Sequence, residues 1–170
     1  MKLCARLAAD VRAMKQDFAP LALDAASAFG GMAGSMREQL EKVELAATGE
    51  EESRYARHTL ADMRANVAGA RRIFEAFRPW LAASPDGLAA ATQVEDGLTR
   101  LESAYAVVSG DALPPLPAGW SALAPSAEAL ATPFGRLYAA VKAEADEESP
   151  ASLGAALAQA ARAMNLPVLP

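Results

Sequence analysis

The sequence predicts an all-α protein, an up-and-down helical bundle of four longer helices plus one or two shorter ones. Alanine dominates the apolar residues and β-branched residues are few, which favours helix because alanine loses no side-chain entropy there. Apolar residues recur at spacings of three and four, and no alternating strand pattern competes. With 52% hydrophobic and 22% charged residues, the chain is expected to fold as one domain over 1–170.

The first two helices are predicted over 2–18 and 24–47. The stripe of the first is formed by Leu3, Leu7, Val11, Met14 and Phe18. Pro20 ends this helix or starts the next element, because proline is disfavoured inside a helix. Glycines in the second helix weaken it by ~1 kcal/mol each relative to alanine and permit a kink or a close helix approach. They are Gly30, Gly31 and Gly34.

A third helix is predicted to start at Ser53 or Tyr55, after a polar break, and to run to about Phe77. Pro79 then marks a kink or the start of a new turn. A fourth helix starts with Ser84 as its cap and proline at its first position, and it carries an apolar stripe as far as Val108.

The last third of the chain is punctuated by prolines and acidic residues. The stretch 110–119 holds three prolines and two glycines and is expected to be a loop. A fifth helix is predicted over 120–145, with Pro125 and Pro133 as points where it kinks or divides. After a break at 146–150, a final helix fits Ala151 to Met164.

Charge and composition exclude several classes of function. The formal net charge is −5, so a phosphate backbone or an anionic lipid surface is not an expected partner. No run of 18 apolar residues predicts membrane insertion. Arg6, Asp10 and Arg12 interrupt the N-terminal segment, so no signal peptide is expected in this chain. Cys4 is the single cysteine and has no Cys-His-Asn arrangement around it, and no nucleophile elbow or phosphate-binding loop is present.

Two residues are candidate metal ligands. His58 and Asp62 are four residues apart and therefore share a helix face. A metal needs three or four ligands, and only two are visible, so a surface pair near a helix start is the alternative. The acidic run at 50–52 is expected at a helix N-terminus, as a solvated cap or as a group that attracts hard cations.

Several other residues of the third helix are expected to have structural roles. Asn66 is predicted to hydrogen-bond across the core, and Gly69 to let another helix approach closely. Arg71 or Arg78 is expected to pair with Glu75 or other acids, a ligand carboxylate being the less favoured partner. Three aromatic residues are predicted to pack in the core or at its rim: Tyr55, Trp80 and Trp120.

The stretch from Thr48 to Leu81, TGEEESRYARHTLADMRANVAGARRIFEAFRPWL, resembles the C-terminal half of the EfeO/EfeM proteins, which belong to the imelysin-like group. The family pattern combines a GEE turn, an arginine–tyrosine pair, an A-N-V-x-G-A segment and a final F-R-P. The residues of this chain that carry the signature include Arg54, Tyr55, Asn66, Gly69 and Arg78. The resemblance extends, with fading strength, over roughly 3–141.

The resemblance implies a periplasmic protein that assists iron uptake through a permease. Family members resemble a pair of helical bundles, and their metal site uses an H-x-x-E motif in the half that precedes this one. Here the residue three after His58 is Ala61, so that motif is absent. Thr59 and Ala68 also replace acidic residues that many relatives carry. The chain is therefore expected not to be a peptidase, since no ligand set would activate a water.

Three hypotheses stay open at this stage. The first is a non-catalytic metal-handling or scaffold role, with iron or another divalent or trivalent metal and the proteins of an iron-permease system as partners. The second is a structural helical interaction module that docks a missing N-terminal half or forms a homodimer, which an exposed apolar patch would favour. The third is a degenerate metallopeptidase-like domain.

Overall fold

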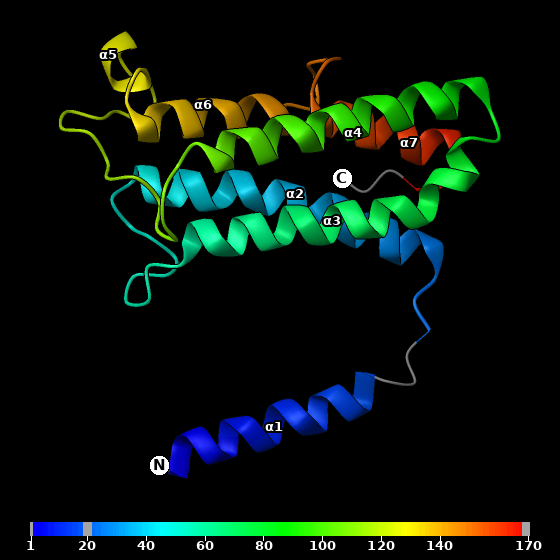
Figure 1. Ribbon diagram of the computed structural model, residues 1–170, viewed down its shortest axis with the longest axis horizontal. Coiled ribbons are helices and arrows are strands. Elements are labelled where there is room, and N and C mark those ends of the chain that lie inside the picture. The colour runs from blue at the N-terminus through cyan, green and yellow to red at the C-terminus, as the bar shows by residue number, and fades with distance from the viewer. Residues whose placement is uncertain (1, 19–21, 168–170) are drawn as a thin grey trace.

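A computed structural model describes residues 2–18 and 22–167, and within these ranges the chain forms seven helices and no strand (Figure 1). The helices are α1 (Lys2–Phe18), α2 (Ala25–Ala47), α3 (Thr59–Leu81), α4 (Pro85–Ala106), α5 (Ala127–Leu130), α6 (Pro133–Ala145) and α7 (Leu153–Ala163). The predicted all-α class is confirmed. Pro20, the expected end of the first helix, lies outside the described residues.

The bundle has four walls, which are α2, α3, α4 and the pair of short helices α6 and α7. Helix α2 packs on α3, and α3 packs on α4. Helix α4 packs on α7 and α6, and these two pack back on α2. Figure 1 shows α6 and α7 following one another along the bundle, so that two short helices together replace a fourth long one. Helix α1 stands apart from this assembly (Figure 1).

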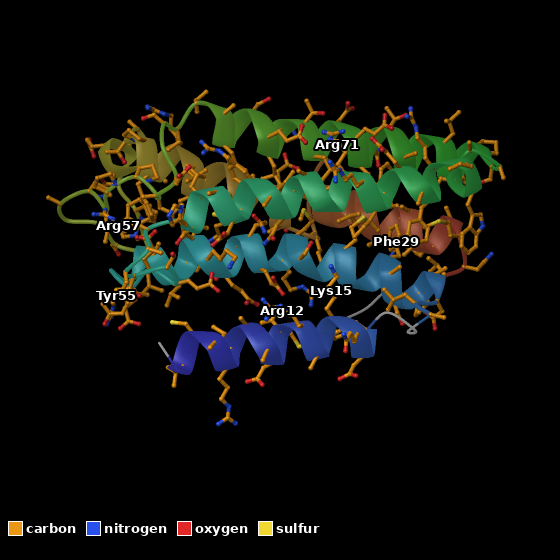
Figure 2. The ribbon with its side chains drawn as sticks, turned by 60° about the horizontal axis from the view of Figure 1, so that its bottom comes forward. Arg12, Lys15, Phe29, Tyr55, Arg57 and Arg71 are labelled. Carbon is orange, nitrogen blue, oxygen red and sulfur yellow. The ribbon has the colours of Figure 1, made fainter. Side chains whose placement is uncertain are left out.

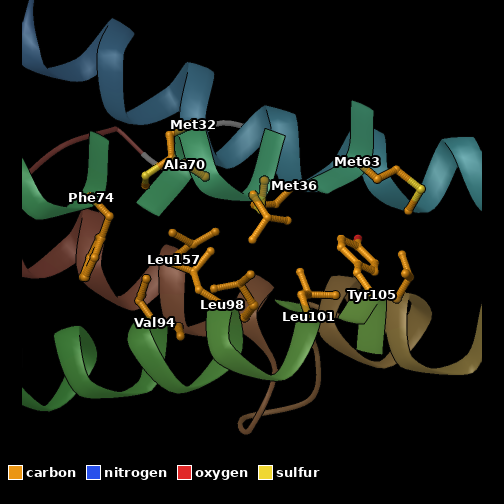
Figure 3. Close-up of a cluster of buried hydrophobic side chains, with 14 of the residues drawn as sticks. Met32, Met36, Met63, Ala70, Phe74, Val94, Leu98, Leu101, Tyr105 and Leu157 are labelled. Atoms are coloured by element: carbon orange, nitrogen blue, oxygen red, sulfur yellow. The ribbon is translucent and has the colours of Figure 1, made fainter. Parts of the chain in front are cut away.

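The interior is filled by apolar side chains from all four walls (Figure 3). The largest of the fully buried side chains include Phe74, Met32, Met63, Leu98 and Phe134. One polar pair is buried among them: the Tyr105 hydroxyl donates to Gln39 Oε1 at 3.2 Å, and Gln39 Nε2 donates to the Ser35 carbonyl at 3.0 Å. Gln39 is fully buried, so this chain of hydrogen bonds satisfies an amide that has no access to water.

Short polar side chains begin most of the helices. Asp24 accepts the Ser27 amide at 2.7 Å and starts α2. Ser84 accepts the Gly87 amide at 3.1 Å and starts α4, with Pro85 in the first turn as predicted. Each cap satisfies an amide that a helix leaves without an internal partner.

The predicted start of the third helix is wrong by several residues. Arg57 has a φ of 54°, a left-handed conformation that a right-handed helix cannot contain. The preceding residues form a turn in which the His58 amide donates to Ser53 Oγ at 3.1 Å. Helix α3 therefore begins at Thr59, and it runs through Pro79 to Leu81.

The predicted fifth helix over 120–145 is wrong in its first part and divided in its second. Residues 120–126 are not helical. Helix α5 is a single turn, and α6 begins at Pro133 with Thr132 as its cap, because proline lacks an amide and suits a first helical turn. Trp120 instead packs edge-on against Phe134 and Tyr138, with ring centroids 5.1 and 5.2 Å away.

A close helix approach occurs at Gly97, a glycine for which none was predicted. A Cβ on Gly69, Gly31 or Gly34 would meet no atom within 4 Å, so these positions face open space and the expectation for Gly69 is wrong. A Cβ on Gly97 of α4 would lie 2.8 Å from the Cβ of Leu153 at the start of α7. Gly97 is thus the residue that brings α4 and α7 together.

Candidate functional site

The predicted metal ligands lie at the end of the bundle where α3 begins. His58 occupies the N-cap position of α3, with no side-chain capping bond, and its side chain is 55% exposed. The 107–126 connection reaches this end, because the carbonyl of Asp111 accepts the backbone amides of Leu60 and Ala61 at 2.9 and 3.1 Å. Asp111 therefore caps the first turn of α3 through its backbone.

The structure gives His58 a partner that the sequence did not indicate. His58 Nδ1 lies 3.6 Å from Asp111 Oδ2, and the Asp111 side chain is 59% exposed. Asp62 is exposed in the first turn of α3, and its amide donates to the His58 carbonyl at 3.0 Å. Within the described ranges, no three His, Cys, Asp or Glu residues are grouped so as to hold a metal ion. The His58–Asp62 site stays a prediction.

Arg64 fastens the same end of the bundle. Its guanidinium donates to the carbonyls of Tyr105 at 2.9 Å and Gly110 at 2.6 Å, and also to that of Val108. These carbonyls belong to the last turn of α4 and the residues just after it, which have no partner inside the helix. A cation there also interacts favourably with the helix dipole. The Arg64 side chain therefore has a structural role, which is to join α3 to the end of α4.

Three buried polar atoms near this end have no hydrogen-bond partner among the described residues. They are Glu51 Oε1, Thr59 Oγ1 and Trp120 Nε1. Thr59 is only 1% exposed, so its hydroxyl lacks access to bulk water. The residues come from the 48–58 connection, the first turn of α3 and the 107–126 connection.

The acidic run was expected at a helix N-terminus, and that expectation is wrong. Residues 50–52 lie in the connection that precedes the turn before α3. Glu52 forms an ion pair with Lys42 of α2. The turn that contains Arg57 separates residues 50–52 from the helix, so the carboxylates of this acidic run do not lie in the first turn of α3.

The signature residues of α3 and its preceding turn are distributed over different environments. Tyr55 is 94% exposed, so the prediction that it packs is wrong (Figure 2). Asn66 is half-buried, and no hydrogen bond joins its side chain to another described residue, contrary to the bond expected across the core. Arg54 is exposed in the turn. Trp80 is half-exposed and stacks on Phe77 at 6.5 Å, as rim packing predicts.

The arginines of α3 pair with acids of α4. Arg71 makes a two-pronged contact with Glu102, at 2.8 and 2.9 Å, and also reaches Thr99. Arg78 Nε lies 2.9 Å from Glu95 Oε1. The predicted pairing with protein acids is thus confirmed, and the acids come from the neighbouring helix rather than from Glu75.

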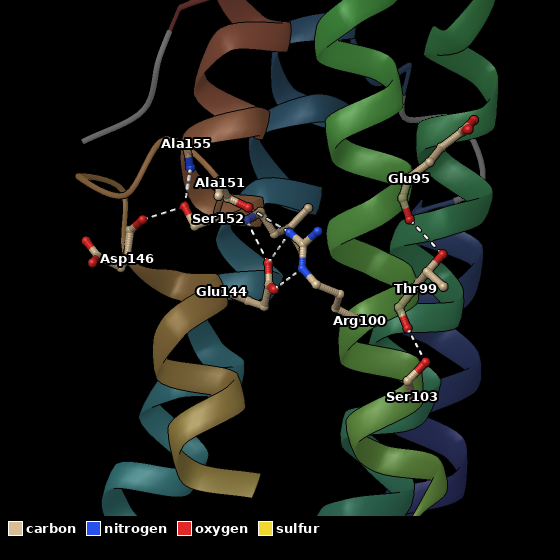
Figure 4. Close-up of polar contacts among 10 residues, drawn as sticks. Glu95, Thr99, Arg100, Ser103, Glu144, Asp146, Ala151, Ser152 and Ala155 are labelled. Atoms are coloured by element: carbon tan, nitrogen blue, oxygen red, sulfur yellow. Dashed lines mark hydrogen bonds and ion pairs between the residues drawn. The ribbon is translucent and has the colours of Figure 1, made fainter. Parts of the chain in front are cut away.

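A second polar cluster joins α4 to the junction of α6 and α7 (Figure 4). Arg100 contacts both carboxylate oxygens of Glu144 and donates to the Ala151 carbonyl at 2.7 Å. Glu144 also accepts the Leu153 amide at 2.9 Å, and its side chain is 10% exposed. This cluster holds the two short helices in line as one wall, which explains how the bundle closes without a fourth long helix.

A small apolar groove of about 170 Å³ lies between α2 and α7. Phe29, Met36 and Leu157 are among its apolar lining residues. Arg37 and Glu147 also line it and lie 3.3 Å apart as an ion pair.

Among the described helices, α1 carries the most exposed large apolar side chains. Its whole stripe faces solvent, with exposed fractions of 85% for Leu3, 66% for Leu7, 49% for Val11, 52% for Met14 and 61% for Phe18. Figures 1 and 2 both draw α1 outside the bundle. None of the helices in the described ranges combines the length and apolar character that crossing a bilayer requires.

Comparison with known proteins gives one match. The family model described as imelysin matches residues 2–137, which includes α1 through the first part of α6. No curated protein and no solved structure matches the chain.

Proposed function

The chain belongs to the imelysin family, and we propose that it acts there as a non-catalytic helical scaffold of a periplasmic iron-uptake system. The observation that carries the proposal is the exposed apolar stripe of α1, because monomeric soluble proteins rarely leave such a surface uncovered. An interaction module needs a surface of this kind. The other long helices, α2, α3 and α4, pack on one another or on α6 and α7.

The charged side chains of the bundle support the same proposal. Arg64 is held by backbone carbonyls, Arg71 by Glu102, and Arg100 by Glu144. These bonds stiffen the contacts between helices and leave the groups engaged with the protein. Such a body is suited to present a docking surface, with an iron-permease protein or an N-terminal half of the family as the partner.

A metal-handling role is the second candidate, and one observation favours it. His58 and Asp111 lie within 3.6 Å of one another on exposed side chains, and Asp62 is in the adjacent turn. An imidazole and carboxylates are ligands that iron and zinc accept. Under this alternative a further ligand would come from another chain or from solvent.

Calorimetric titration with Fe³⁺, Fe²⁺, Cu²⁺ and Zn²⁺ separates the two roles. The scaffold proposal expects no binding of micromolar or tighter affinity that depends on His58. The comparison uses His58→Ala, Asp62→Ala and Asp111→Asn, with Asp86→Asn, an exposed acid at the start of α4, as the matched control. Binding lost in the first three variants and kept in the control would replace the scaffold role with metal handling.

A further inference from the structure

The exposed residues of α1 have the spacing of a coiled-coil seam. Leu7, Val11, Met14 and Phe18 are separated by four, three and four residues, which is the alternation of d and a positions in a heptad. Cys4 occupies the preceding a position and is also exposed. The side chains of such a seam pack between those of another helix that has the same heptad period.

We propose that α1 docks against the α1 of a second copy of this chain, as a short parallel two-stranded coiled coil. The proposal rests on the scaffold role proposed above, since it names what the exposed stripe of α1 contacts. No other helix of the described ranges packs extensively on α1, so the seam is available to a second copy. Figure 2 shows the length of α1 lying outside the bundle.

The charges beside the seam select the parallel arrangement. Asp10 is at a g position and Lys15 is at the e position five residues later. In a parallel pair each Asp10 faces Lys15 of the other copy, so two opposite-charge contacts form. Both side chains are exposed, and among the described residues Asp10 forms one ion pair, with Arg6 of its own helix at 3.8 Å.

The antiparallel arrangement is disfavoured by the same residues. It would bring g positions opposite one another, so Asp10 would face Asp17 of the second copy, twice. In the parallel pair Leu3 at g lies opposite Ala8 at e, which adds apolar contact at the N-terminal end, and the position five residues after Asp17 lies beyond the end of α1. The pattern therefore matches one orientation and opposes the other.

The size of the seam sets the strength of the pair. Five partly exposed side chains from each copy would bury on the order of 1,000 Å², the lower limit of specific interfaces. Association must also overcome the loss of translational and rotational freedom. We therefore expect a dissociation constant in the micromolar range or weaker, and a monomer–dimer equilibrium that responds to protein concentration.

Sedimentation equilibrium of the full chain over a wide concentration range tests the proposal with charge reversals. Asp10→Lys and Lys15→Asp should each weaken the dimer by about tenfold, because two attractive pairs become repulsive. The double variant should recover the wild-type constant. Gln16→Lys, on the face opposite the seam, is the control and should change little. A tighter dimer in Asp10→Lys would overturn the parallel orientation, because it would report relief of the Asp10–Asp17 contact.

Two further measurements address the seam itself. Val11→Asp should abolish the dimer and leave the thermal unfolding midpoint of the bundle unchanged. In the parallel pair both Cys4 residues lie in one layer, so diamide, which accepts the two protons and two electrons, should yield a disulfide-linked dimer. Cys4→Ser should still dimerise without covalent linkage. A wild-type chain that stays monomeric at millimolar concentration would overturn the dimer, whereas the scaffold role fails on the separate metal titration.

Discussion

A methyl group added at Gly97 should destabilise the protein through one identifiable contact. The new Cβ would lie 2.8 Å from Leu153 Cβ and 3.1 Å from both Leu153 Cα and Cδ1. The first two of these atoms cannot move without moving the α7 backbone, so α4 and α7 would have to separate. Overpacking of this kind costs ~1–3 kcal/mol. Alanine gains ~1 kcal/mol over glycine in a helix interior, so Gly97→Ala should lose about 1 kcal/mol net.

Gly69→Ala is the matched control for this substitution. Gly69 is also inside a helix, and its added methyl would meet no atom within 4 Å. This variant should therefore gain the propensity term alone, ~0.5–1 kcal/mol. Because that term is shared, the difference between the two variants isolates the α4–α7 contact, at ~1–3 kcal/mol. Urea unfolding followed by circular dichroism measures both, and equal stabilisation of the two variants would refute the assigned role of Gly97.

Two further substitutions test the polar contacts that close the bundle. Tyr105→Phe should lose about 1–2 kcal/mol, because it removes the donor to the buried Gln39 oxygen. Burial raises the pKa of Tyr105, so its stabilising effect is complete below the unfolded-state pKa of about 10 and is lost as the pH rises further. The variant should lack that alkaline loss in urea unfolding at several pH values. Arg64→Met should cost about 1–3 kcal/mol, because it removes the guanidinium hydrogen bonds to the carbonyls at the end of α4. Arg72→Met, exposed on the same helix, should change stability by less than about 0.5 kcal/mol. Thermal unfolding measures both arginine variants. Equal melting temperatures would contradict a stabilising role for the Arg64 hydrogen bonds.

The fold class and most helices followed from local patterns because their causes are local. Ser84 and Pro85 mark a helix start in any context, and the structure places α4 directly after Ser84. The start of α3 did not follow, because the left-handed conformation of Arg57 is rare for a non-glycine residue and leaves no sequence signal. The predicted helix over 120–145 was expected either to kink or to divide at Pro133, and it divides there. The non-helical stretch that precedes α5 was not predicted, since the apolar period continues through it.

The contacts of the candidate site depended on tertiary structure that spacing does not encode. His58 and Asp62 were paired by their separation along one helix, whereas the acid that lies within ion-pair distance of His58 among the described residues is Asp111, from a connection distant in sequence. The glycines show the same limit. Gly69 and Gly97 both interrupt apolar helices, and only the position of Leu153 distinguishes the one that touches a neighbour. A short motif therefore indicates candidate residues without identifying their partners.

The apolar stripe of α1 shows why exposure is informative once a structure is available. Leu7, Val11 and Met14 have the same period as the stripes of α2, α3 and α4, and a sequence pattern does not distinguish a face that the same chain covers from one that it leaves open. In the structure the other three stripes are buried and that of α1 is not. Most helical stability in proteins comes from packing of the apolar face, so a surface that covers its stripe would stabilise α1. The Asp10 and Lys15 pattern then specifies the parallel second copy as the surface to test first.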